Sequence, residues 1–270
     1  MKWNRIGDET ECPICRHLGW CMVSSDHRYI CCKRVRSPIA LGEAGSIHPY
    51  RGVLNIHPQQ TNYDPNYWRK TWAKSTTILP GYLASLWNVS LESIEVFNTT
   101  WHTSKRCYLF PMYNGTGEMV GLQERHLTGE KKATAGSKLG LFIPTFNFRQ
   151  TKGLIITEGV SDAVVLYEDT HLPIIGRPSC STGTSHIKDF LNSYTNIKNV
   201  VIVTDNDDVG IQGAQSLRDT LKDTIKYLDV TILPPVAGSK DVREMKRNNP
   251  SYYRNFLELL KNVLYFSKGD

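Results

Sequence analysis

The chain of 270 residues has the composition of an ordinary globular protein, with 40% hydrophobic and 21% charged residues. These fractions exclude a collagen-like, coiled-coil or wholly disordered chain. The 32 Lys and Arg outnumber the 26 Asp and Glu, which gives a net charge of +6. This excess is compatible with a polyanionic partner but is far below that of a histone-like protein. The sequence has no run of about 18 apolar residues and no apolar signal segment at its start, so we expect a cytoplasmic protein with no membrane partner.

Five of the seven cysteines lie close together near the N-terminus. Cys12 and Cys15 form a Cys-x2-Cys pair, Cys21 follows, and the adjacent Cys31 and Cys32 complete the cluster. In a cytoplasmic chain such clustering favours a metal site over disulfides, and four thiolates satisfy tetrahedral Zn²⁺. We therefore predict a structural zinc site formed by Cys12, Cys15, Cys21 and either Cys31 or Cys32. The spacing does not choose between the last two, and possible substitutes are His17, His27 and His48.

Basic and aromatic residues accompany the cysteine cluster. Lys33, Arg34 and Arg36 place positive charge around the predicted zinc site, and Trp20 offers a ring on which a base could stack. This combination is typical of surfaces that bind single-stranded DNA. A purely structural ribbon, with Trp20 packed in its core, is an equally good interpretation.

The segment of residues 51–75 is polar and contains two prolines and several aromatic residues beside basic ones. We interpret it as a linker with a docking segment. The region that follows, residues 76–150, combines two short helical patterns with two strands, expected at residues 107–112 and 119–125. Turn residues between the strands, from Asn114 to Gly117, predict an antiparallel hairpin.

From Gly153 onward, short apolar strands alternate with helical segments. This alternation, with short connections, predicts a parallel α/β sheet with right-handed crossovers. Ligands of such sheets bind at the carboxyl ends of the strands. The four strands are expected at residues 154–156, 173–175, 200–203 and 230–233.

Acidic residues follow two strands of this predicted sheet. Glu158 ends one strand and Asp162 lies one helical turn later, while Asp205 and Asp207 follow another strand. Hard oxygen ligands at neighbouring strand ends suit Mg²⁺ or Mn²⁺ when substrate phosphates complete the metal's ligand shell. For either motif alone, helix capping and turn formation would be an equally good interpretation. The presence of both favours a shared metal site, since both strands end at one crevice.

These motifs resemble the TOPRIM domain of DnaG-type and phage-type DNA primases. The chain has E-G-x-x-D at residues 158–162, D-x-D-x-x-G at residues 205–210, and a K-D pair at Lys240 and Asp241. The resemblance implies that Glu158, Asp205 and Asp207 bind a catalytic metal. It implies supporting roles for Asp162 and Asp208, a phosphate contact for Lys240, and a metal or template contact for Asp241.

The middle region also resembles the part of such primases that holds nucleotide phosphates. Gly121 to Arg125, two adjacent lysines, and Gly136 to Phe142 carry this likeness. It implies that the incoming nucleotide and the nascent primer are held by Arg125, Lys131, Lys132 and Lys138. The alternative is a solvated basic face without a ligand.

We therefore expect an α/β protein, α+β overall. Its parts would be a four-cysteine zinc ribbon, a small mixed α+β basic subdomain, and a TOPRIM parallel-sheet domain with flanking helices. The expected boundaries are 1–50 for the ribbon, 51–75 for the linker, 76–150 for the basic subdomain, 151–248 for TOPRIM, and 249–270 for a C-terminal amphipathic helix.

The C-terminal helix, expected from Ser251 to Phe266, carries an apolar stripe. We favour a stripe that covers the TOPRIM sheet as core; the alternative is a dock for a separate helicase or other replication partner. The residues assigned to the stripe are Phe256, Leu259, Leu260, Val263 and Leu264.

The function implied by the resemblance is that of a DNA primase, which makes short oligonucleotides on single-stranded DNA from nucleoside triphosphates by metal-dependent nucleotidyl transfer. The alternatives are a TOPRIM nuclease and a catalytically silent, primase-like DNA-binding module. Because the sequence has no P-loop motif, we expect the replicative helicase to be a separate protein. If the chain is phage-encoded, its location is the interior of the host cell.

Overall fold

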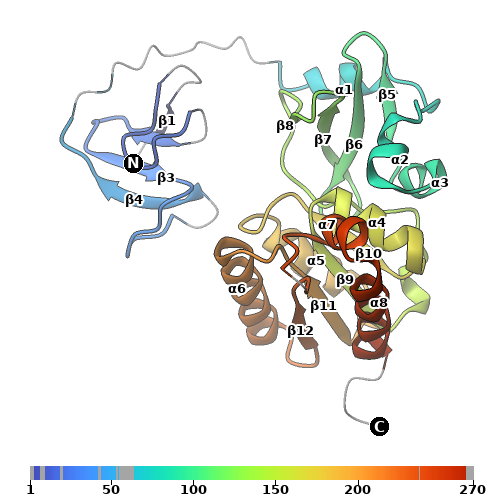
Figure 1. Cartoon of the computed structure of the whole chain (residues 1–270). Coiled ribbons are helices and arrows are strands. Elements are labelled where there is room, and N and C mark those ends of the chain that lie inside the picture. Colours follow the sequence, from blue (N-terminus) through green and yellow to red (C-terminus); the bar gives the residue numbers. More distant parts are fainter. Residues whose placement is uncertain are drawn as a thin grey trace. The chain divides into compact units, whose positions relative to one another are not determined.

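The computed structural model describes residues 3–6, 10–18, 21–41, 44–52, 54, 64–236 and 238–265. The chain divides into two compact units, Met1–Tyr63 (unit 1) and Asp64–Asp270 (unit 2) (Figure 1). Trp20, considered above as a stacking platform, lies outside the described residues, as do residues 53 and 55–63 of the expected linker.

Unit 1 is a small antiparallel sheet with strand order β1-β2-β3-β4. Its apolar core is equally small, and half of its buried members are cysteines: Ile6, Cys12, Cys21, Val23, Ile30 and Cys32. A core of this size supplies little stability by itself, so the unit needs a further cross-link such as a metal ion. The strands are β1 (Trp3–Arg5), β2 (Met22–Ser24), β3 (Tyr29–Cys32) and β4 (Ser46–Pro49).

Unit 2 begins with three short helices and a four-stranded antiparallel sheet of order β5-β6-β7-β8. The predicted hairpin is present as β6 and β7, whereas α1, β5 and β8 were not predicted. These three elements have three to six residues, too few to establish a periodic pattern. The elements are α1 (Tyr67–Trp72), α2 (Tyr82–Trp87), α3 (Leu91–Glu95), β5 (Thr100–His102), β6 (Cys107–Tyr113), β7 (Met119–His126) and β8 (Lys131–Ala133).

The second sheet of unit 2 is parallel, with strand order β10-β9-β11-β12. All four strands expected from the sequence are present. The order reverses between β9 and β11, which is where open α/β sheets form their ligand crevice. The elements are β9 (Gly153–Glu158), α4 (Val160–Thr170), β10 (Ile174–Arg177), α5 (Thr184–Ser193), β11 (Asn199–Val203), α6 (Asp208–Thr224), β12 (Asp229–Leu233), α7 (Val242–Asn248) and α8 (Pro250–Tyr265).

Helices cover both faces of this parallel sheet. Ile155 and Val201 point into a core shared with α4, α7 and α8, whereas Ile156 and Ile202 point into a second core shared with α5 and α6. Successive strand residues alternate between the two faces, so these strands are apolar throughout. None of the described helices combines the length and apolar character needed to cross a membrane.

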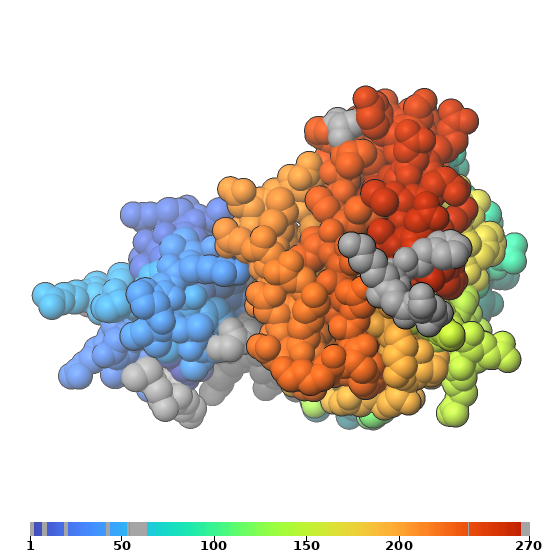
Figure 2. Space-filling view, turned by 90° about the horizontal axis from the view of Figure 1, so that it is seen from below, coloured from blue at the N-terminus to red at the C-terminus, as the bar shows by residue number. Residues whose placement is uncertain are grey.

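The C-terminal helix α8 packs its apolar side into the first of these cores, so its stripe is not free for a partner. Gly153 allows this close approach, because a Cβ there would lie 2.5 Å from Cγ of Leu264. The assignment of Leu259 to the stripe is wrong, since this residue is 45% exposed. Helical spacing instead buries Tyr253, Phe256, Leu257, Leu260 and Leu264. In Figure 2 the surface of the C-terminal helices (red) lies beside that of the segment containing α6 and β12 (orange).

This burial gives a matched pair of substitutions on α8. Leu260→Ala should lower the free energy of unfolding by about 2–5 kcal/mol, because it removes a wholly buried side chain and leaves a cavity. Leu259→Ala should change it by less than about 0.5 kcal/mol, since its side chain is exposed. Urea unfolding followed by circular dichroism measures both values, and equal effects would contradict this packing of α8.

Candidate functional site

Four cysteine sulfurs of unit 1 form a compact cluster. The Sγ atoms of Cys12, Cys15, Cys21 and Cys32 lie within 4.8 Å of one another. The Cys15–Cys21 and Cys21–Cys32 sulfur distances are 3.7 and 3.8 Å. A tetrahedron with Zn–S bonds of about 2.3 Å has sulfurs about 3.8 Å apart. The cluster therefore has the dimensions of a four-thiolate zinc site.

The structure distinguishes Cys32 from its neighbour Cys31. Consecutive residues of β3 point to opposite sides of the sheet, and Cys31 Sγ donates to the carbonyl of Ala44 at 3.3 Å, away from the cluster. Cys32 Sγ accepts hydrogen bonds from the backbone amides of Arg34 and Val35. None of the three histidines considered as substitutes belongs to this cluster of described residues.

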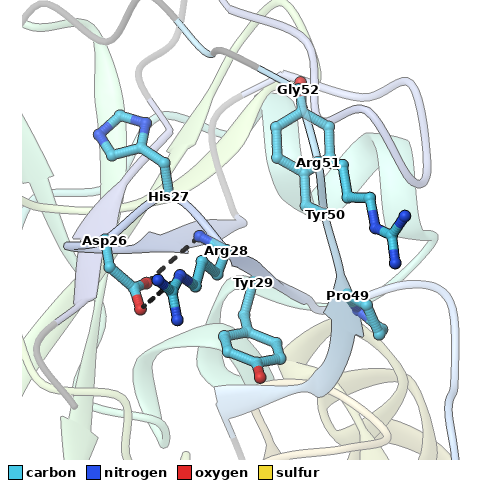
Figure 3. Close-up of a pocket in the computed structure, with 8 residues that line it drawn as sticks. All are labelled: Asp26, His27, Arg28, Tyr29, Pro49, Tyr50, Arg51 and Gly52. Atoms are coloured by element: carbon cyan, nitrogen blue, oxygen red, sulfur yellow. Dashed lines mark hydrogen bonds and ion pairs between the residues drawn. The ribbon is translucent and has the colours of Figure 1, made fainter.

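A groove of about 500 Å³ lies elsewhere on unit 1 (Figure 3). Two tyrosines and two arginines line it, and the backbone amide of Tyr50 donates to the carbonyl of Arg28 at 2.7 Å, which joins its two sides. Aromatic rings beside guanidinium groups form a surface suited to nucleic-acid bases and phosphates. The lining residues are Asp26, His27, Arg28, Tyr29, Pro49, Tyr50, Arg51 and Gly52.

In unit 2, the acidic motifs lie at the carboxyl ends of β9 and β11. Glu158 is the last residue of β9, and Gly159 follows with φ of 98°, which allows the sharp turn into α4. Asp205 follows β11 by two residues, and Asp207 is the N-cap of α6. Because β9 and β11 are hydrogen-bonded neighbours, their acidic ends meet at one crevice.

The oxygen atoms of these acids differ in what they contact. Oε2 of Glu158 is buried and has no hydrogen-bond partner among the described residues. Oδ1 of Asp207 accepts from the backbone amide of Gly210 at 2.8 Å, which leaves Oδ2 for a ligand. Asp208, expected to support the site, is exposed in the first turn of α6.

Asp162 and Asp241 are joined by an arginine that the sequence analysis missed. Nε of Arg243 lies 3.2 Å from Oδ1 of Asp162, and its Nη2 lies 2.5 Å from Oδ2 of Asp241. Oδ1 of Asp241 also caps α7 by accepting from the Glu244 amide at 2.7 Å. These two carboxylates therefore connect α4 to α7, and the only sequence signal for Arg243 was its position two residues after the K-D pair.

Burial and the proximity of further carboxylates raise the pKa of two members of the acidic cluster, which consists of Glu158, Asp162, Asp205, Asp207 and Asp241. Burial raises the pKa of Asp205 to about 6, with further contributions from Glu158 and Asp241, while Lys240 acts in the opposite direction. Burial also raises the pKa of Asp162 to about 7, against the influence of Arg243. An unpartnered buried carboxylate oxygen beside further carboxylates is a donor set that fits Mg²⁺ or Mn²⁺.

The raised pKa of Asp205 predicts a pH dependence of stability for the metal-free protein. The folded state holds the pKa of Asp205 at about 6 rather than the ordinary 3.8, so the free energy of unfolding falls as the pH rises from about 4 to 6. Asp205→Asn cannot ionise at this position, so it should not lose this part of the free energy of unfolding. In metal-free buffer its melting temperature should exceed that of the wild type at pH 8 and equal it at pH 4.

Thermal scans with and without Mn²⁺ measure this effect. Added Mn²⁺ should raise the melting temperature of the wild type more than that of Asp205→Asn, because the wild type retains the ligand. Asp219→Asn, which removes an exposed carboxylate from α6, is the control and should melt like the wild type. A melting temperature for Asp205→Asn below that of the wild type at pH 8 without metal would contradict the predicted destabilisation by the ionised Asp205 carboxylate.

Of the four basic residues assigned to the nucleotide, Arg125 lies near Asp162 and Arg243. Burial and the nearby Arg243 lower its pKa, and Asp162 opposes them. Lys131 is its partner in the β7–β8 ladder and so points to the same face. Lys132 is opposite Glu124, points to the other face, and pairs with Glu130 at 3.2 Å. The structure therefore does not bring Lys132 to this site.

Lys138 is exposed in the loop that follows β8, where its backbone amide donates to the carbonyl of Val120 at 3.0 Å. The same loop continues to Phe142, which pairs with Gly176 of β10. Lys240 is also exposed, and its carbonyl accepts from the amide of Asn206 at 2.7 Å. Lys240 is therefore beside the D-x-D turn.

Comparisons with known proteins agree with this architecture. Residues 155–245 match the family model described as Toprim-like. The primase fragment of the bacteriophage T7 primase-helicase protein has 15% sequence identity and a TM-score of 0.50, over 93% of this chain and 97% of that one. The E. coli primase catalytic core has 14% identity and a TM-score of 0.52, over 72% of this chain and 77% of that one.

A sequence search of curated proteins gives no significant match. At identities near 15%, the structural matches are a likeness of fold. The family match contains both the β9 end and the D-x-D turn that carry the acidic cluster. Residues 155–245 therefore match the Toprim-like family, and the fold of the chain resembles those of the T7 primase fragment and the E. coli primase catalytic core.

Proposed function

We propose that this protein is a DNA primase that makes short oligonucleotide primers on single-stranded DNA. The observation that carries the proposal is the acidic cluster at the β9–β11 crevice of a Toprim-like domain. Glu158 presents an unpartnered buried oxygen there, and Arg125, on β7 of the antiparallel sheet, lies near Asp162. Acidic metal ligands beside a cation suit the transfer of a charged nucleotidyl group.

The residues that would hold a divalent metal are Glu158, Asp205 and Oδ2 of Asp207. When bound, Mg²⁺ or Mn²⁺ would supply positive charge that favours deprotonation of the primer 3′-hydroxyl and neutralises the departing pyrophosphate. Arg125, Lys131, Lys138 and Lys240 are proposed to bind nucleotide and primer phosphates. The Asp162–Arg243–Asp241 bridge would hold α4 and α7 in place around the reacting groups.

Unit 1 would bind the template. Zn²⁺ at Cys12, Cys15, Cys21 and Cys32 would stabilise its small sheet, and the groove beside Tyr29 and Tyr50 offers a surface for bases. We propose a separate replicative helicase or other replication protein as a further partner.

Substitution in the groove tests this role of unit 1. Arg51→Ala should weaken the binding of single-stranded DNA several-fold and make it less sensitive to salt, since it removes one cation that contacts phosphate. Arg254→Ala, at an exposed position on α8, removes the same charge elsewhere and should have little effect. Fluorescence anisotropy with a labelled oligonucleotide at several salt concentrations measures both, and equal losses would contradict a specific role of the groove.

The proposed function itself is tested by incubating the protein with labelled nucleoside triphosphates, Mg²⁺ or Mn²⁺, and single-stranded DNA of random sequence. A primase gives short new chains that require both template and metal. Shortened DNA without new chains would instead identify a nuclease, and binding without any product would identify a silent DNA-binding module. Reactions without template and reactions with a chelator are the controls.

A further inference from the structure

Arg177, the last residue of β10, is a buried cation beside the acidic cluster. It is 1% exposed and is the direct ladder partner of Glu158 on β9. Directly paired residues point to the same face of a sheet, so both side chains leave the sheet on the same side. Arg177 lies just beyond the strand expected at residues 173–175, and the sequence pattern assigns it no role.

The guanidinium group of Arg177 is only partly satisfied. Nη1 donates to the carbonyl of Cys180 at 2.8 Å and lies 3.5 Å from the carbonyl of Gly213. Nε and Nη2 are buried without a hydrogen-bond partner. No carboxylate oxygen of the described residues lies within 4.0 Å of its nitrogens.

Such a group is costly to bury, because a charge removed from water needs compensation. The negative charges that can compensate Arg177 are those of the acidic cluster on the neighbouring strand. There, Oε2 of Glu158 is likewise buried and has no hydrogen-bond partner among the described residues. Burial lowers the pKa of Arg177, and the carboxylates of Glu158 and Asp205 act in the opposite direction. A buried cation and two partly buried carboxylates therefore lie at neighbouring strand ends.

We propose that Arg177 is a resident counter-charge of the acidic cluster. It stabilises the carboxylates of Glu158 and Asp205 in the metal-free protein and thereby lowers the affinity of this cluster for a divalent cation. This inference rests on the proposed function, since it assumes that the cluster binds metal. Its consequence is that the negative charge of nucleotide phosphates should strengthen metal binding.

The competing interpretation is that Arg177 only supports the loop that follows β10, through its bond to Cys180. The two roles differ in the expected response to loss of charge. A loop support that is removed should loosen the site and weaken metal binding. A counter-charge that is removed should strengthen metal binding, since it eliminates repulsion between the guanidinium and the divalent ion.

The experiment is a titration of the metal-free protein with Mn²⁺ alone, followed by isothermal calorimetry and by loss of the free Mn²⁺ signal in electron paramagnetic resonance. Arg177→Met, which removes the charge and keeps much of the volume, should bind Mn²⁺ at least about tenfold more tightly than the wild type. Arg177→Lys keeps the charge and should bind within about threefold of the wild type. Arg254→Met, at an exposed position on α8, should be unchanged.

Equal or weaker binding by Arg177→Met would overturn the inference. Circular dichroism verifies that each variant is folded, and Arg177→Gln, which can still donate to the Cys180 carbonyl, replaces the methionine variant if that one unfolds. Unfolding of both neutral variants would assign Arg177 to the framework of the domain and also overturn the inference. Absence of Mn²⁺ binding in the wild type and in all variants would contradict the proposed metal site itself, and the inference with it.

Discussion

Asp205→Asn and Asp207→Asn should each abolish primer synthesis and leave the fold intact. Each substitution removes a negative charge from the proposed metal site with almost no change in volume. Asn is also a good N-cap. The side-chain oxygen of Asn at this position can therefore accept the hydrogen bond that the backbone amide of Gly210 donates to Asp207 in the wild type. Loss of several kcal/mol of transition-state stabilisation corresponds to a rate lower by about a thousandfold or more.

The measurement is template-dependent incorporation of labelled nucleotides over a range of Mg²⁺ and Mn²⁺ concentrations. Asp208→Asn is the matched control, because Asp208 is the next residue along the chain and, unlike Asp207, is not among the carboxylates that raise the pKa of Asp205; it should retain most of the activity. Thermal unfolding in the presence of chelator verifies that each variant is folded. Near-normal synthesis with an unchanged metal optimum in Asp205→Asn or Asp207→Asn would remove the assignment.

Cys32→Ser should lose zinc and unfold unit 1, whereas Cys31→Ser should retain both zinc and fold. The sulfurs of these neighbours point to opposite sides of β3, and only that of Cys32 belongs to the four-sulfur cluster. Structural Zn²⁺ contributes about 10–16 kcal/mol of binding free energy in small zinc domains. The small core of unit 1 cannot replace a contribution of this size.

Elemental analysis of protein purified without added metal should give one zinc per chain for the wild type and for Cys31→Ser. Chelation of the wild type should reproduce the effect of Cys32→Ser, and both should lose binding to single-stranded DNA. The separate core of unit 2 should still unfold cooperatively in both cases. Wild-type protein without stoichiometric zinc, or zinc retained by Cys32→Ser, would show that the cluster is not the proposed site.

The central strands β9 and β11 of the parallel sheet could be predicted because both of their faces are buried, which gives continuous apolar runs. The acids at their ends were found because Glu158, Asp205 and Asp207 follow such runs directly. Short strands gave no pattern, so β8 was missed. Without β8, the sequence could not show that Lys131 and Lys132 point to opposite faces.

Two buried or partly buried arginines, Arg177 and Arg243, could not be assigned to the site from the sequence. A charged residue in the sequence suggests solvent exposure, and burial depends on which elements the fold brings together. Arg177 is buried because β10 lies beside β9, and Arg243 is placed by the packing of α7 against α4. The error at Leu259 has a similar origin. Helical spacing fixes the buried face of a helix only to within about one residue unless the surface that it packs against is known.

The cap on α6 has a consequence for how the acidic cluster assembles. Asp207 uses one oxygen to hold the first turn of α6 and has the other available to a metal. Fraying of that turn would therefore release the side chain that a metal needs, and a bound metal would in turn oppose the fraying. The end of the helix and the candidate ligand thus form one cooperative element, in which local unfolding and metal affinity are two measures of the same equilibrium.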